Sequence, residues 1–150
     1  MDVNEVKTEE TIQFIVVKFE QEQYGINIQN VQNIVRMLNI TRVPNAPSCF
    51  KGVINLRGEI IPVMSVRNKF DLDDDEYTNS TRIIIVKVEG HAIGLVVDEV
   101  LEVIQLTPDQ IEKIVRDSQD EKAKYVYAVG KLGDELVTLL NIEALIGVDE

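Results

Sequence analysis

Few residues in this chain have the types and the spacing that catalysis or metal binding requires. The single histidine, His91, stands beside Gly90 in a segment typical of a hairpin turn, with no nucleophile or second imidazole nearby in the sequence. The acidic run 71–76 is dense enough for a calcium loop, but Glu76 occupies the position of the required glycine and Arg82 that of the last acidic ligand. We therefore expect an exposed histidine and a solvated acidic loop.

The glycine pairs do not have the pattern of a nucleotide site. Gly90 and Gly94, like Gly130 and Gly133, are not followed by Lys-Ser/Thr or by a third glycine that opens a helix. Carboxylates are abundant, but they gather at the termini and between the two halves, where they favour solubility over paired acid–base catalysis. Cys49 is the only cysteine, which agrees with a reducing compartment. We expect no enzyme activity, no cofactor and no metal.

The composition excludes several classes of partner. A chain of 150 residues with 45% hydrophobic content is sufficient for one domain with a substantial core. The formal net charge of -11 disfavours nucleic acid and anionic membranes, because both attract clustered Lys and Arg. No apolar run approaches the length of a membrane span, and the N-terminus has no basic segment followed by an apolar one. We expect a cytoplasmic protein without direct membrane insertion.

The most specific stretch of the chain is the segment 40–47, Ile-Thr-Arg-Val-Pro-Asn-Ala-Pro. Its two prolines fix their own φ and disfavour helix in the residues before them, so the segment predicts a rigid irregular turn. Residues 43–47 would then form an apolar knuckle, and a stiff loop loses little entropy when a partner covers it. The alternative is that the prolines only terminate strands and cover the end of a barrel.

Two apolar runs within residues 52–63 follow the knuckle and predict a β-hairpin. Its turn lies at 55–58, where Gly58 is free to adopt positive φ, Leu56 packs and Arg57 projects. This turn contains no nucleophile, metal ligand or phosphate cradle.

The chain contains an internal repeat. Displacing the sequence by 69 positions places residues 15–34 on 84–103, and displacement by 76 positions places residues 53–66 on 129–142, with identical or similar side chains at many positions. The loop between the matched segments is therefore seven residues longer in the second copy. Chance similarity between β-rich segments is the alternative, since apolar alternation alone matches some of these positions.

Each copy has the pattern of a short all-β unit, with β-branched runs separated by polar turns. Residues 31–38 fit a helical turn leading into a strand as well as a full helix. Asn141 predicts the N-cap of a short helix, and Thr107-Pro108 predicts another helix start. The predicted strands are 12–19, 24–28, 52–57, 60–65, 82–88, 92–97, 125–132 and 135–140.

Five short strands in each copy favour a small closed barrel, because closure removes exposed edges. We therefore predict an all-β fold with short helices, in which two pseudo-symmetric five-stranded barrels from an internal duplication pack side by side. The whole chain, 1–150, would be a single domain, with barrel halves at about 12–75 and about 80–148.

These motifs, in their order and spacing, resemble the CheW-like domain family of chemotaxis proteins, which is related to the regulatory domain of the histidine kinase CheA. The resemblance covers nearly the whole chain, and the combination of motifs is more specific than any one of them. The matching segments are 14–17, 24–28, 43–47, 55–58, 94–98 and 140–143.

The resemblance implies two SH3-like barrels around a shared hydrophobic seam. It also implies a non-enzymatic adaptor that couples the tips of chemoreceptors, the methyl-accepting chemotaxis proteins, to the regulatory domain of CheA. A kinase regulatory module expressed alone and the adaptor half of a CheV-type protein are rival interpretations within the family. We favour the free adaptor, because the chain ends at Glu150 without a kinase core or a receiver domain.

Two sets of binding residues follow from motif positions in the family. The receptor tip would dock in a groove at the seam, while CheA would contact the knuckle and its approximate equivalent in the second copy, around 111–115, whose pattern looks helical. Asn33 and Ser65 depart from the family pattern, so no salt bridge is expected at either position. The receptor-binding residues are Ile15, Ile28, Val31, Ile34, Arg57 and Val100; the kinase-binding residues are Ile40, Thr41, Val43, Pro44, Asn45, Ile111 and Glu112.

A small-molecule-binding sensor barrel is the alternative from a different functional class. Its pocket would lie in the seam between the barrels, and binding of a metabolite would raise the melting temperature.

Overall fold

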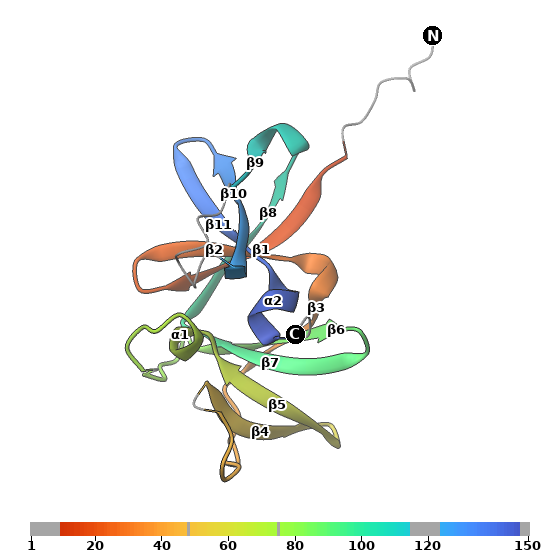
Figure 1. The fold of residues 1–150 in the computed structure, drawn as a ribbon, viewed down its shortest axis with the longest axis vertical. Helices are drawn as coiled ribbons and strands as arrows, with labels where there is room; N and C mark the ends of the chain where they lie inside the picture. The colour runs from red at the N-terminus through yellow and green to blue at the C-terminus, as the bar shows by residue number, and fades with distance from the viewer. Residues whose placement is uncertain (1–9, 48, 75, 115–123, 148–150) are drawn as a thin grey trace.

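The computed structural model describes residues 10–47, 49–74, 76–114 and 124–147. These residues form two β-sheets with a few short helices (Figure 1). The elements of the first half are β1 (Ile12–Phe19), β2 (Glu22–Asn27), the 3₁₀ turn η2 (Ile28–Asn30), β3 (Val31–Arg36), β4 (Phe50–Leu56), β5 (Glu59–Ser65) and α1 (Val66–Lys69). Those of the second half are β6 (Arg82–Val88), β7 (His91–Val97), β8 (Glu99–Leu106), the 3₁₀ turn η3 (Pro108–Gln110), β9 (Ile111–Lys113), β10 (Val126–Leu132), β11 (Glu135–Leu140) and α2 (Ile142–Ile146).

The two sheets are each a mixture of both sequence halves. One sheet has six strands in the order β8-β1-β2-β11-β10-β9, and the other has five in the order β3-β6-β7-β5-β4. The β1–β2 hairpin of the first half therefore completes the sheet of the second half, and the β6–β7 hairpin completes the sheet of the first. The parallel pairs β11–β2 and β5–β7 join the exchanged hairpins to their new neighbours.

This exchange differs from the expectation that each half forms its own barrel. The all-β fold with two barrel-like units is confirmed, but the division at residues 75–80 does not separate the sheets. The physical reason is that hydrophobic alternation predicts strands without predicting their partners, and equivalent hairpins fit either barrel. The chain consequently passes from one sheet to the other twice, at η2 and between β7 and β8.

Buried strands separate their side chains into different cores. The buried side chains form three cores: one in each sheet and one shared by both sheets, which we call the seam core. In β1, Phe14 and Val16 belong to the core of the six-stranded sheet, whereas Ile15 and Val17 belong to the seam core. Alternation along the strand produces this division, since successive side chains point to opposite faces. The seam core consists of buried Ile15, Val17, Phe19, Ile26, Met64, Val66, Phe70, Ile84, Val86, Val88, Leu95, Val97, Tyr125, Leu140, Ile142 and Leu145.

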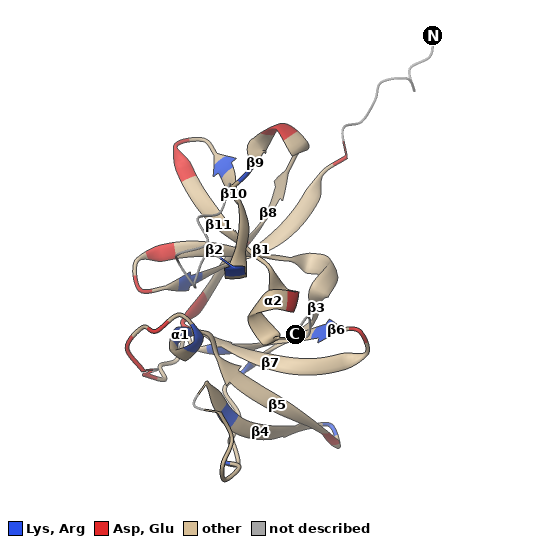
Figure 2. Ribbon diagram, viewed as in Figure 1, with Lys and Arg blue, Asp and Glu red and all other residues tan. Residues whose placement is uncertain are grey.

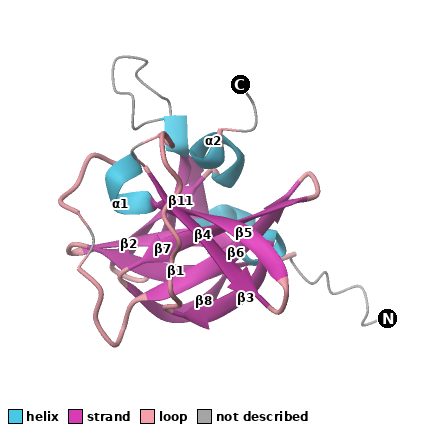
Figure 3. Ribbon diagram, turned by 90° about the horizontal axis from the view of Figure 1, so that it is seen from below, coloured by secondary structure: helices cyan, strands magenta, loops and turns pink. Residues whose placement is uncertain are grey.

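The seam core follows the repeat. Ile15 and Ile84 are equivalent positions, as are Met64 and Leu140, and all four side chains are buried in it. Strands of both halves thus contribute equivalent residues to one core, and the short helices α1 and α2 lie on the same side of the strands (Figure 3).

Several local predictions are confirmed. Asn141 caps α2, with its Oδ1 accepting a hydrogen bond from the Ala144 backbone N–H at 3.2 Å. Pro108 opens the 3₁₀ turn η3 after Thr107. Residues Val31–Arg36 form a strand, as in the first of the two alternatives, but the helical turn that leads into it lies before this stretch, at Ile28–Asn30.

The helical appearance of 111–115 is wrong. Residues Ile111–Lys113 form β9, paired with β10, because the β10 backbone offers these residues ladder hydrogen bonds that outweigh local propensity. Residue 115 lies outside the described residues.

The β4–β5 turn has the predicted geometry. Leu56 pairs with Glu59 across a two-residue loop in which Arg57 and Gly58 both have positive φ, 54° and 86°. Positive φ at both positions matches the twist of the flanking strands. Leu56 packs against the core of the five-stranded sheet, and Arg57 is exposed.

Charged residues lie mainly at turns, at strand ends and in the loop after α1, whereas the middles of the strands are largely uncharged (Figure 2). Among the described residues, no helix has the length and apolar character needed to cross a membrane.

Candidate partner-binding surfaces

The knuckle, residues 43–47, is held at the outer end of the five-stranded sheet by its base. Thr41 forms a two-way backbone bridge with Val53 of β4, with N···O distances of 2.8 and 2.9 Å. Phe50 closes the other end by donating its backbone N–H to the Pro47 carbonyl at 2.9 Å. Asn45 has a φ of 64° at the tip of the loop, a conformation that asparagine tolerates better than most residues.

A glycine makes the approach of Thr41 possible. Gly52 has a φ of 141°, and a Cβ atom placed there would clash with the Thr41 carbonyl oxygen. Any larger residue would have to push the base of the knuckle away from β4. The tight fit fixes the loop before a partner arrives.

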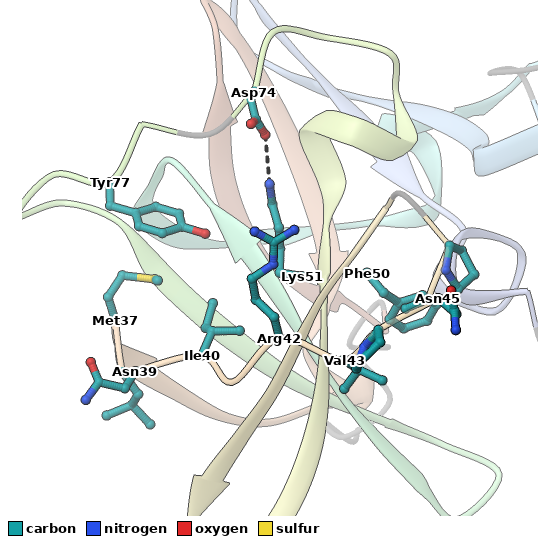
Figure 4. Close-up of a pocket in the computed structure, with 14 residues that line it drawn as sticks. Met37, Asn39, Ile40, Arg42, Val43, Asn45, Phe50, Lys51, Asp74 and Tyr77 are labelled. Carbon is teal, nitrogen blue, oxygen red and sulfur yellow. Dashed lines mark hydrogen bonds and ion pairs between the residues drawn. The ribbon is translucent and has the colours of Figure 1, made fainter.

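An open hollow of about 1020 Å³ lies beside the knuckle (Figure 4). Its apolar lining includes Met37, Ile40 and Phe50, and Tyr77 closes it from the loop after α1. Lys51 also lines the hollow. The residues therefore come from three separate segments of the chain.

The hollow has cationic groups in an otherwise acidic protein. The Lys51 ammonium lies 2.7 Å from the Asp74 carboxylate, as the dashed line in Figure 4 marks. Arg42 lies on the exposed loop that lines the same hollow. The combination of apolar and cationic groups suits a protein surface that carries both apolar and acidic side chains.

The predicted kinase-binding residues fall into two groups at opposite ends of the long axis (Figure 1). At the knuckle, Val43 is 46% exposed, Thr41, Pro44 and Asn45 are exposed, and Ile40 is half-buried against the core of the five-stranded sheet.

The second group lies on β9. Ile111 packs against the core of the six-stranded sheet, and Glu112 is exposed and bonded to Lys131 at 2.7 Å. That contact lowers the pKa of the Glu112 carboxyl below its ordinary value. Glu112 pairs with Val129, just as Thr41 pairs with Val53 at the equivalent position of the repeat.

Four of the predicted receptor-binding residues gather at the seam core. Ile15 is buried in it and is therefore not accessible to a partner. Ile28, Val31 and Val100 are half-buried and pack against it. The structure thus brings together residues from β1, η2, β3 and β8.

The other two predicted receptor-binding residues lie differently. Ile34 is 39% exposed on β3, next to the seam-core residue Ile84 across the ladder. Arg57 stands at the tip of the β4–β5 hairpin, whose Leu56 packs in the core of the five-stranded sheet. The structure therefore does not group Arg57 with the residues at the seam core.

Sequence reasoning missed two apolar residues on β8. Val103 is 51% exposed and lies across the ladder from Ile15, and Leu101 is also exposed. The repeat contained the signal for Val103, because Ile34 and Val103 are equivalent positions. We use the name seam surface for the partly exposed residues Ile28, Val31, Ile34, Val100 and Val103.

Among the described residues, no group of three or more His, Cys, Asp and Glu side chains is placed to hold a metal ion. His91 is exposed at the start of β7, as predicted.

Comparisons with known proteins agree with this architecture. The family model described as CheW-like domain matches residues 13–150. The chemotaxis protein CheW of Klebsiella aerogenes is 34% identical over 138 residues, which are 92% of this chain and 83% of that protein. The chemotaxis protein CheW of Helicobacter pylori is 34% identical over 141 residues, 94% of this chain and 85% of that protein.

A solved structure has the same fold. The crystal structure of the scaffolding protein TtCheW from Thermoanaerobacter tengcongensis matches with a TM-score of 0.84 at 31% identity, covering 93% of this chain and 95% of that chain.

Proposed function

Because the chain belongs to the CheW-like domain family, we propose that it couples chemoreceptor tips to the regulatory domain of the histidine kinase CheA. A scaffold role in chemotaxis follows from family membership and from the fold that the chain shares with the scaffolding protein TtCheW. The identity of the two partners and the residues that contact them form the finer part of the proposal.

One observation supports the proposal most directly: two sets of exposed apolar residues, the knuckle and the seam surface, lie on separate parts of one molecule. The knuckle lies at the outer end of the five-stranded sheet, while the seam surface lies where the two sheets meet. An adaptor needs two surfaces that are occupied at the same time. The mechanism is then geometric, since the chain holds two partners at a fixed spacing.

The seam surface suits a helical partner. It offers partly exposed β-branched residues, among them Ile34 and Val103, on a buried base. Apolar residues at helical spacing on a receptor tip would supply most of the binding energy here. Arg57, at the exposed tip of the β4–β5 hairpin, would add a charged contact with the receptor.

The knuckle suits a preformed protein surface. Val43 and Pro44 are exposed on a loop whose base is fixed by Thr41 and Gly52, so little ordering entropy is lost on binding. The surface on β9 would form a second contact with the kinase, because Ile111 and Glu112 occupy the equivalent place in the repeat.

The sensor-barrel alternative has less support. Its pocket would occupy the seam, but the seam is filled by buried side chains from both sheets, so the space that a ligand needs is taken. Open hollows lie outside this core, at the knuckle, beside Arg67 and Asp98, and beside Ile28. Thermal shift measurements with metabolites would test this alternative.

Substitution at the knuckle tests the proposal. We expect Val43→Glu to weaken binding of the CheA regulatory domain at least about tenfold, because it places a charge in the contact, while receptor-tip binding and melting temperature stay unchanged. Ile60→Glu is the matched control, since Ile60 is a 59% exposed strand residue on β5, outside the knuckle, the seam surface and β9. Equal kinase binding by both variants and the unchanged protein would contradict the knuckle assignment.

A further inference from the structure

An arginine-centred ion cluster lies at one of the two places where the chain passes between the sheets. The guanidinium of Arg67, on α1, grips the Asp98 carboxylate with two bonds: Nε donates to Oδ1 at 2.8 Å and Nη2 to Oδ2 at 2.7 Å. Its Nη1 donates to Glu20 Oε2 at 2.8 Å and to the Asp73 backbone carbonyl at 3.0 Å. The Arg67 side chain is only 14% exposed.

The position of Asp98 gives this cluster a role in the architecture. Asp98 is the single residue between the end of β7, in the five-stranded sheet, and the start of β8, in the six-stranded sheet. Its Oδ2 also accepts a bond from the Glu20 backbone N–H at 3.3 Å. The β7–β8 crossing is thereby tied to the β1–β2 turn and to α1.

The equivalent crossing of the first half cannot form such a cluster. In the repeat, Gln29 corresponds to Asp98 and Glu143 to Arg67, whereas Glu89 corresponds to Glu20. A neutral amide and an acid replace the bidentate pair, so no arginine is available at these positions to hold the crossing at η2. That crossing has a local cap instead, in which Asn27 Oδ1 accepts from the Gln29 backbone N–H at 2.9 Å.

The bidentate geometry matters for how firmly the crossing is held. A forked arginine–carboxylate pair fixes direction as well as distance, and its charge-assisted bonds are roughly twice as strong as neutral ones. The hydrogen bonds that Arg67 donates to Asp98 raise the pKa of the guanidinium above its ordinary value, so Arg67 stays charged at physiological pH. By contrast, the Lys131–Glu112 pair is exposed on both sides and holds its strands weakly.

We propose that Arg67 is a positioning residue for the seam surface: by gripping Asp98 it fixes the β7–β8 crossing and thereby sets the place of Val100 and Val103. This inference rests on the proposed docking of a receptor helix at the seam surface. Val100 follows Asp98 by two residues and Val103 by five, on a strand that forms the edge of its sheet. Without the grip, binding has to order the crossing, and affinity falls by that cost.

A double-mutant cycle with Arg67→Gln and Asp98→Asn tests the inference on the full chain. We expect each single variant to weaken receptor-tip binding about tenfold, and the double variant to lose little more, because both changes remove the same contact. In Asp98→Asn, which leaves the Arg67–Asp73 bond in place, binding of the CheA regulatory domain at the knuckle stays unchanged, which a general loss of folding would not allow. Arg67→Lys keeps the charge without the fork and recovers only part of the receptor affinity.

Amide hydrogen exchange of residues 98–103 provides a second measurement that needs no receptor. We expect faster exchange there in Asp98→Asn and no change along β3, with Lys131→Gln as a control that breaks an ion pair elsewhere. The role of Arg67 would be overturned if Asp98→Asn left exchange at 98–103 unchanged, or if Arg67→Gln bound the receptor tip as tightly as the unchanged protein. Either result would leave the proposed function intact. Failure of the unchanged protein to bind the receptor tip would overturn the proposed function and this inference together.

Discussion

The two crossings between the sheets are equivalent in the repeat, yet they are held in different ways. The first crossing is a capped 3₁₀ turn, Ile28–Asn30, and the second is the single residue Asp98 gripped by Arg67. Around both of them the seam core keeps matching apolar residues, such as Ile15 and Ile84. The apolar positions of the repeat therefore maintain the architecture, while charged positions have diverged and make the two ends of the seam different.

The first prediction tests whether the two halves contribute equally to the seam core. Ile15→Ala and Ile84→Ala should each lower the free energy of unfolding by about 2–5 kcal/mol, because each leaves a cavity in a close-packed core. Chemical denaturation of both variants measures this. The equivalence of the halves would be contradicted if one substitution proved nearly neutral and the other severe.

The second prediction separates the two barrel ends. Gly52 and Ala128 are equivalent positions beside matching irregularities of β4 and β10, but Gly52 has a φ of 141° and lies so close under the Thr41 carbonyl that an added Cβ would clash with it. We expect Gly52→Ala to cost about 1–3 kcal/mol of stability through backbone strain, and to weaken kinase binding by displacing the base of the knuckle.

Gly133→Ala is the control for this second prediction. Gly133 also has positive φ, but nothing lies within 4 Å of where its Cβ would be, so the variant should lose some stability and keep its binding. Kinase binding that is equally weak in both variants would show that strain in general, and not the displaced knuckle, is responsible.

The third prediction concerns the caps of the two short helices. Ser65 and Asn141 are equivalent, and each accepts a hydrogen bond from the backbone N–H three residues later, at 3.0 and 3.2 Å. Replacing either by alanine should cost about 1 kcal/mol in the free energy of unfolding, measured by chemical denaturation. A much larger cost at Ser65 alone would mean that its buried hydroxyl does more than cap α1.

The smallest effect is expected from tyrosine ionisation. Burial, and then the charge of Glu22, raise the pKa of Tyr24 to about 12, whereas the ordinary value is 10.0. Folding therefore favours the neutral phenol, so its contribution to stability is complete below about pH 10 and is lost as the pH rises toward 12. Tyr24→Phe should flatten the fall of melting temperature above pH 10.

Tyr127 offers a comparison on the other side of the same sheet, because burial also raises the pKa of this residue on β10. Tyr127→Phe should likewise reduce the fall of melting temperature above pH 10. If the melting temperature fell equally above pH 10 in the unchanged protein and in both variants, ionisation of these phenols would not be the cause of the fall.

Much of the fold was accessible from the sequence because its signals are local. Strand alternation, the Gly58 turn and the Asn141 cap depend on neighbouring residues, and the structure confirms them. The repeat correctly predicted equivalent positions in the two halves. It did not predict the hairpin exchange, because a repeat states which strands are alike and not which strands pair.

The site was harder to predict from the sequence, because its residues come together only through contacts between distant parts of the chain. Arg67 and Asp98 are 31 positions apart and meet only through the exchanged topology. Propensity made 111–115 look helical, but pairing with β10 decided the conformation of the residues described there. Arg57 was grouped with the seam by motif position; it stands at the tip of the β4–β5 hairpin, and its contact with the receptor stays a prediction.

The central claim is that the knuckle and the seam surface bind different partners at the same time. The most direct test saturates the isotopically labelled protein with the CheA regulatory domain, adds a receptor-tip fragment and follows the backbone amide signals. We predict that kinase shifts centre on residues 43–47, that receptor shifts centre on Val31, Val100 and Val103, and that receptor affinity is within about twofold of that for the free protein. Displacement of one partner by the other, or overlapping sets of shifted residues, would contradict this claim.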